Sequence, residues 1–190
     1  YFVMKPAKVP YNQLLDNIGH TIEAARQHAF VAVNKQLVKA NWEIGRHLVE
    51  FEQQGKERAE YGSGLLARLS KDLTIRYGKG FGRRNVLDMR RFYLAFPKWQ
   101  TVSAKLSWSH YLLILKLENE KARDYYIEQT IASNWSVRAL ERQINSLYYE
   151  RLISSQEKQP VIQESKENTK NLQLTAKDII KDLIYQVRKS

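Results

Sequence analysis

Three consecutive residues, Arg83, Arg84 and Asn85, follow a glycine-rich segment that covers residues 77–82. An arginine can bond guanine O6 and N7 through two parallel hydrogen bonds, and an asparagine amide can do the same with adenine N6 and N7. Four nearby cations have the chemistry that suits phosphate oxygens, namely Arg76, Lys79, Arg90 and Arg91. Residues 61–100 hold nine Lys or Arg against two acidic residues, in a chain whose net charge is +11. Such a concentrated excess indicates a polyanion-binding face.

The alternative interpretation is a solvated helix surface whose arginines only keep the protein soluble. Two features favour contact with a polyanion instead. Arg83 and Arg84 are adjacent at an expected helix start, where the helix dipole disfavours cations, and Asp88 is the one acid nearby. Selection for stability alone would place acids at that position. The pattern therefore favours nucleic-acid binding.

The remaining chemically capable residues do not assemble into a site. The chain has no cysteine, which excludes disulfides and thiolate chemistry and fits a reducing cytoplasm. Glu164-Ser165-Lys166 matches the Glu-x-Lys of metal-dependent nucleases, but no strand pattern surrounds it, so we interpret the match as chance. We expect no catalytic residue, no metal site and no cofactor. The four histidines show no metal-ligand spacing and are interpreted as surface or boundary residues: His20, His28, His47 and His110.

Apolar periodicity predicts an all-α fold that begins with a long helix. From Tyr11 to about Gln54, apolar side chains recur every three or four residues and no proline interrupts them. One rod and two helices with a break near Asn34 both fit this pattern. Gly45, in the middle of the pattern, costs ~1 kcal/mol relative to alanine, which predicts a close backbone contact there.

Shorter helices follow the long one. Helices predicted over residues 63–76 and 83–96 flank the glycine-rich turn and have the outline of a helix-turn-helix, with a winged-helix variant left open. In such units the start of the second helix enters the major groove. Further helices are predicted over 111–117, 121–132 and 137–153.

Two local features accompany these later helices. Ser136 is expected to cap the helix over 137–153, because a serine side chain accepts hydrogen bonds from free amide groups at a helix start. The aromatic cluster around Trp108 and Tyr111 is expected to pack in the core rather than to stack on bases.

The composition changes beyond residue 153. Residues 154–173 are rich in Gln, Glu, Lys, Ser and Asn, and they have little to bury, which predicts a disordered linker. Residues 174–190 regain some apolar character, yet no run in the chain approaches the ~20 residues that a membrane span needs. We expect a cytoplasmic domain over 11–153, a flexible polar tail and no contact with a membrane.

Eight segments occur in order between residues 11 and 153: NWEIGRHL (41–48), RAEYG (58–62), YGKGFGRRN (77–85), MRRFY (89–93), LSWSH (106–110), RDYY (123–126), WSVRAL (135–140) and YER (149–151). With these segments the chain resembles the N-terminal domain of the YhcG-like family of bacterial PD-(D/E)xK nuclease-domain proteins. The resemblance implies a helical, DNA-binding domain that precedes a nuclease domain.

The chain departs from that family in two places. Gly82 stands where the family usually carries a serine, so the cap of the expected recognition helix is weaker. LTAKDIIKD (174–182) resembles the lead-in to the nuclease domain, where the family continues with a proline and an aromatic residue, but this chain reads LIYQ. We therefore expect 174–190 to be a truncated lead-in to a missing nuclease domain, from which no catalytic residue can be carried over.

These observations leave two functions of different kinds. The first is a double-stranded-DNA-binding domain of a nuclease-type protein, non-catalytic by itself. The second is a protein-interaction module that partners a nuclease, in which the helix over 11–54 forms a homodimer and the basic face is incidental. The two can coexist, because a dimer presents paired half-sites. A self-sufficient enzyme is disfavoured, because no metal or nucleophile constellation is present in the sequence.

Overall fold

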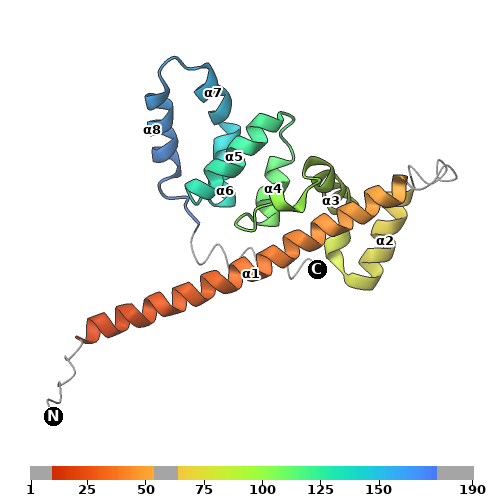
Figure 1. Cartoon of the computed structure of the whole chain (residues 1–190), viewed down its shortest axis with the longest axis horizontal. Helices are drawn as coiled ribbons and strands as arrows, with labels where there is room; N and C mark the ends of the chain where they lie inside the picture. The colour runs from red at the N-terminus through yellow and green to blue at the C-terminus, as the bar shows by residue number, and fades with distance from the viewer. Residues whose placement is uncertain (1–9, 54–63, 175–190) are drawn as a thin grey trace, which may run out of the picture.

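The computed structural model describes residues 10–53 and 64–174, and the part that it describes is all-α (Figure 1). It contains no strand in these ranges, only an isolated bridge between Trp135 and Gln173. None of the described helices is long and apolar enough to cross a bilayer. The elements in order are α1 (Tyr11–Gln53), α2 (Leu65–Tyr77), the 3₁₀ turn η2 (Lys79–Phe81), α3 (Arg83–Ala95), η3 (Trp99–Thr101), α4 (Trp108–Ile114), α5 (Glu120–Ala132), α6 (Val137–Asn145), α7 (Tyr148–Ser154) and α8 (Lys158–Thr169).

The long N-terminal pattern forms a single helix, so the alternative of a break near Asn34 is excluded. Helix α1 has 43 residues, and its first half projects past the rest of the molecule (Figure 1). Asn34 is buried, and its amide nitrogen donates to the carbonyl oxygens of Ala104 at 3.0 Å and Leu106 at 2.7 Å. This side chain therefore fastens the middle of α1 to the loop that precedes α4.

Helices α1 and α3 cross with almost no space between their backbones. A Cβ atom added to Gly45 would lie 2.1 Å from the carbonyl oxygen of Met89 and 3.1 Å from the Cβ of Tyr93. The close backbone contact predicted at Gly45 is confirmed. It holds α3 against α1 in a fixed position, which matters because α3 carries most of the candidate site.

The core extends from α1, α3 and α4 into α5, α6 and α7, and aromatic rings are prominent where α3 meets α4. The ring of Phe92 lies 4.7 Å from that of Tyr111, 5.2 Å from that of Trp108 and 5.5 Å from that of Phe96, measured between centroids. The pairs with Trp108 and Phe96 are edge-to-face, which is a favourable arrangement for aromatic side chains, and the pair with Tyr111 is tilted. The expectation that Trp108 and Tyr111 pack in the core is confirmed.

His110 corrects the interpretation of the four histidines as surface or boundary residues, because it is buried. Its Nδ1 accepts from the backbone amide of Ser107 at 3.2 Å, which completes a capping box at the start of α4. Since Nδ1 accepts, the ring proton lies on Nε2, which donates to the carbonyl of Trp135 at 3.1 Å. His20, His28 and His47 are exposed, as expected.

The single helix predicted over 137–153 is divided into α6 and α7, because Leu147 adopts a left-handed conformation with φ of 52°. The hydroxyl of Tyr126 bonds both sides of the break. It donates to the carbonyl of Gln143 at 3.2 Å and accepts from the amide of Tyr149 at 3.1 Å. The predicted cap of α6 is confirmed, since the hydroxyl of Ser136 accepts from the amide of Ala139 at 3.3 Å.

Helix α8 corrects the prediction of a disordered linker over 154–173. Glu164 pairs with Arg151 of α7, and this hydrogen bond lowers the pKa of the Glu164 carboxyl. The amide of Gln143 donates to the carbonyl of Ser165 at 3.2 Å. These contacts with α6 and α7 order a segment whose composition alone offers little to bury. The predicted lead-in over 174–190 lies outside the described residues from 175 onward.

Candidate nucleic-acid interface

The candidate site is built on α2, the turn and α3. Gly78 ends α2 with φ of 98°, a conformation that disfavours any other residue, and its amide donates to the carbonyl of Thr74 at 3.0 Å. The 3₁₀ turn η2 follows directly. The hydroxyl of Ser70 in α2 donates to the carbonyl of Phe81 at 2.8 Å. The turn is therefore tied back to α2, so the start of α3 is presented in one orientation.

The side chain of Asn85 is engaged within the protein, whereas the sequence suggested that its amide was available to bond a base. Its amide nitrogen donates to the carbonyl of Gly80 at 2.6 Å, and its amide oxygen accepts from the indole N–H of Trp108 at 2.9 Å. Both ends of the side chain are therefore bonded within the protein. Asn85 joins the turn to α4, which positions the arginines beside it.

Arg90 is also engaged within the fold. Its Nε donates to both carboxylate oxygens of Glu52, at 2.8 and 3.0 Å. The two side chains are 31% and 29% exposed, so the pair is partly screened from water. Arg90 thus fastens α3 to the end of α1, and its charge is largely compensated by Glu52.

The other predicted cations remain exposed around the start and outer face of α3. The side chain of Arg84 is 86% exposed and that of Arg91 is 57% exposed. Arg76, Lys79 and Arg83 are exposed too, and none of the three forms an ion pair with another residue of the described ranges. Five of the seven predicted residues are therefore exposed on the end of α2, the turn and α3, and we call this set the basic face.

Asp88 is the acid within the basic face. Its carboxylate lies 3.9 Å from Nε of Arg84 and 3.4 Å from a guanidinium nitrogen of Arg91, and the side chain is only 14% exposed. The sequence analysis did not predict this pairing, although the spacing of Asp88, four residues after Arg84 and three before Arg91, is the one at which side chains on a helix meet. Asp88 orients both arginines and partly offsets their charge.

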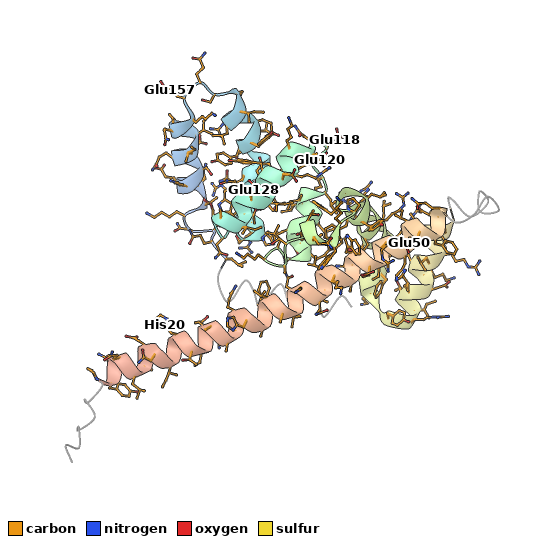
Figure 2. The ribbon with its side chains drawn as sticks, viewed as in Figure 1. His20, Glu50, Glu118, Glu120, Glu128 and Glu157 are labelled. Carbon is orange, nitrogen blue, oxygen red and sulfur yellow. The ribbon has the colours of Figure 1, made fainter. Side chains whose placement is uncertain are left out.

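A depression of about 670 Å³ opens beside the start of α3, between α1 and α4. Lys79, Arg83 and Arg84 line it together with apolar side chains of α1 and α4. The labelled carboxylates Glu118, Glu120 and Glu128 come from α5 and the segment before it, not from α2 or α3 (Figure 2). Among the described residues, no group of three His, Asp or Glu side chains could hold a metal ion.

The fold and the surface together define an all-helical domain with a concentrated cationic face. Residues 17–151 match the family model described as the DUF1016 N-terminal domain, and the chain belongs to this family. The YhcG-like resemblance found in its eight segments is thereby confirmed.

One curated relative is a protein of Escherichia coli (strain K12) described as "Putative nuclease YhcG". The two sequences are 38% identical over 186 residues, which cover 81% of this chain and 50% of that protein. The chain therefore spans about half the length of this relative. No solved structure matches the chain.

Proposed function

We propose that this chain is the DNA-binding N-terminal domain of a cytoplasmic nuclease-type protein, and that it is non-catalytic by itself. The observation that carries the proposal is the basic face, in which five exposed cations lie on the end of α2, the turn and α3, and Asp88 is the acid that pairs with two of them. The description of the Escherichia coli relative as a nuclease supports it, since a nuclease must contact nucleic acid.

The residues have different roles in this proposal. Arg83 and Arg84 lie at the start of α3, the part of a recognition helix that meets base edges in the major groove. Arg76, Lys79 and Arg91 surround them and contact phosphates. Asn85 and Arg90 act indirectly: their bonds to Trp108 and Glu52 keep α3 in place. The helix-turn-helix assignment is part of this proposal.

The proposal predicts strong salt dependence. Each phosphate contact releases counterions and contributes about −0.9 to the slope of log affinity against log salt concentration, so the three cations assigned to phosphates give a slope of roughly −2.7. A groove-reading helix additionally discriminates between sequences, whereas phosphate contacts do not. An incidental basic surface would produce only the weak binding expected of scattered charges.

The test is a fluorescence-anisotropy titration of a labelled duplex at two salt concentrations. Arg83→Ala/Arg84→Ala is expected to weaken binding and to relax discrimination between duplex sequences, because both arginines are assigned to base edges. The matched control Lys158→Ala/Lys166→Ala removes the same charge from exposed positions on α8 and should leave binding nearly unchanged. Equal binding by wild type and the arginine variant, or an equal loss in the control, would refute the assignment. An RNA duplex of the same length tests the preference for DNA.

A second function is favoured by a separate observation on α1. Residues 11–29 of this helix are all exposed, although apolar side chains recur among them. We propose that two copies of the chain associate through α1. Association and DNA binding are compatible, because a two-fold dimer presents two basic faces to paired half-sites.

A further inference from the structure

The first half of α1 carries an apolar stripe that no other described residue covers. Tyr11, Leu15, Ile18 and Ile22 are 75, 57, 47 and 45% exposed, and Ala25 and Ala29 continue the stripe. Helical geometry places this stripe roughly 150° around α1 from the face that packs on α3 and α4. A helix of this length without packing is marginal in water, so its stability calls for a covering partner.

The second half of α1 carries a groove of matching chemistry. Beside α2 the groove has a volume of about 500 Å³, and its lining from both helices is almost wholly apolar: Ile44, Leu48, Phe51, Leu65, Leu69 and Leu73. The depression at the start of α3 adjoins it, because Ile44 and Phe81 line both, and it extends the groove along α1 to Leu37. Within residues 10–53 and 64–174, one chain thus presents an uncovered helix stripe and an unfilled groove.

The geometry points to a second copy of this chain as the occupant, with the two α1 helices antiparallel and the first half of each lying in the groove of the other. This inference rests on the association proposed above and assigns its arrangement. Reversal about residue 31 places each stripe position opposite a position in the second half of the partner subunit's α1, and these opposing positions are apolar except for His47 of the partner subunit. The facing pairs are 11 with 51, 15 with 47, 18 with 44, 22 with 40, 25 with 37 and 29 with 33.

Side-chain size favours the antiparallel arrangement over the parallel one. In antiparallel order Ile22 faces Ala40 of the partner subunit, and Ala25 faces Leu37 of the partner subunit, so large residues meet small ones. In parallel order each residue would face itself, which places alanine on alanine at 25 and 29 and leaves voids between the helices. Well-packed helix pairs alternate large and small residues across the interface.

Charge favours a second copy over a nucleic acid or a membrane. Residues 11–29 contain Asp16 and Glu23 against a single cation, Arg26. An arm that binds DNA or an anionic membrane surface is rich in Lys and Arg instead. A near-neutral helix also avoids the repulsion that a basic helix would meet from Lys79, Arg83 and Arg84, which line one end of the groove.

The size of the contact suits a stable dimer. Nineteen helical residues extend ~28 Å, so one half of α1 covers a strip of that length and ~10 Å width. The dimer has two such contacts and each contact buries two surfaces, which gives a total buried area on the order of 1,100 Å². Specific interfaces exceed about 1,000 Å². Since Met89 of α3 contacts Gly45, the pairing separates the two α3 helices by ~42 Å along the rod, of the order of one DNA turn of 34–36 Å.

The first arm of the test is the mass of the protein in solution, measured by light scattering after gel filtration. Wild type is expected to be a dimer. Ile18→Glu is expected to be a monomer that still unfolds cooperatively and loses no more helical signal by circular dichroism than the first half of α1 contributes. Gln13→Glu adds the same charge to the same half of α1 on the opposite side, so it should remain a dimer. A wild type that stays monomeric at high concentration overturns both the association and its arrangement.

The second arm uses the absence of cysteine from the chain, so that engineered thiols react only with each other. Mixed Ile18→Cys and Ile44→Cys variants should form a disulfide-linked dimer on mild oxidation, and neither variant alone should do so. In the antiparallel pair the two positions 18 lie ~39 Å apart, far beyond disulfide reach. A dimer in which Ile18→Cys alone cross-links overturns the antiparallel arrangement and leaves the association intact. DNA binding is tested separately through Arg83 and Arg84.

Discussion

Replacing Gly45 by alanine tests how closely α1 and α3 approach. The new Cβ would lie 2.1 Å from the carbonyl oxygen and 2.8 Å from the carbonyl carbon of Met89. Both atoms belong to the backbone of α3, so no side-chain rotation can relieve the overlap. The two helices must separate by about 1 Å to restore an ordinary contact of just over 3 Å, which disturbs the packing of Met89 and Phe92 in the core.

The magnitude follows from two opposing effects. Alanine is favoured over glycine in a helix interior by ~1 kcal/mol, which stabilises the variant. Overpacking a filled core costs ~1–3 kcal/mol, and a rigid backbone obstacle places this site at the upper end of that range. We therefore expect Gly45→Ala to lower the free energy of unfolding by ~2 kcal/mol.

Gly19→Ala is the matched control, because it makes the same substitution in the same helix where a Cβ would meet nothing within 4 Å. It should gain the ~1 kcal/mol of helix propensity, so the two variants should differ by ~3 kcal/mol. Urea unfolding followed by circular dichroism measures both, at one protein concentration because association contributes to stability. A Gly45→Ala variant as stable as Gly19→Ala would show that α1 and α3 are not in backbone contact.

Two further predictions concern Asp88 and Tyr126. Asp88→Asn removes the acid that Arg84 and Arg91 share, so the affinity for a duplex, measured by anisotropy, should rise roughly fivefold. This rise is the equivalent of ~1 kcal/mol for one surface charge. Unchanged or weaker binding would contradict the proposed basic face. Burial raises the pKa of Tyr126 to about 12, so this tyrosine stays neutral in the fold at pH values where it ionises in the unfolded chain. Its contribution to stability is present below about pH 10 and is lost between about pH 10 and 12, with a slope of up to ~1.4 kcal/mol per pH unit. Tyr126→Phe should flatten that part of the unfolding curve against pH, and an unaltered slope would assign the loss to other groups.

Apolar periodicity was sufficient for most helices. The predicted helices over 63–76, 83–96 and 121–132 agree with α2, α3 and α5 to within two residues at each end. Spacing, a glycine-rich turn and a capping residue are local properties, so they can be recognised in a sequence. The break between α6 and α7 could not be found in this way, because it depends on the hydroxyl of Tyr126, which lies on a different helix.

In the candidate site, too, local features were predictable from the sequence and long-range contacts were not. The sequence located the cluster of cations, but it could not separate the exposed arginines from those that the fold uses. Arg90 is neutralised by Glu52, which is 38 residues earlier in the chain. The amide oxygen of Asn85 accepts a hydrogen bond from the indole of Trp108, which is 23 residues later in the chain. The prediction of a disordered linker over 154–173 was likewise wrong, because the contacts that order α8 are made with α6 and α7 and composition does not record them.

By itself, the sequence determined the helical class, the extent of the helical pattern over residues 11–54, the location of the positive charge and the family. Each of these is encoded in residue types and in spacings of a few positions along the chain. Only the tertiary structure decided which cations face solvent, that the amide of Asn85 bonds Trp108 of α4, and which part of α1 no other described residue covers. The physical reason is that a hydrogen bond or ion pair between distant residues forms only after packing has brought them together, and no local pattern records that proximity.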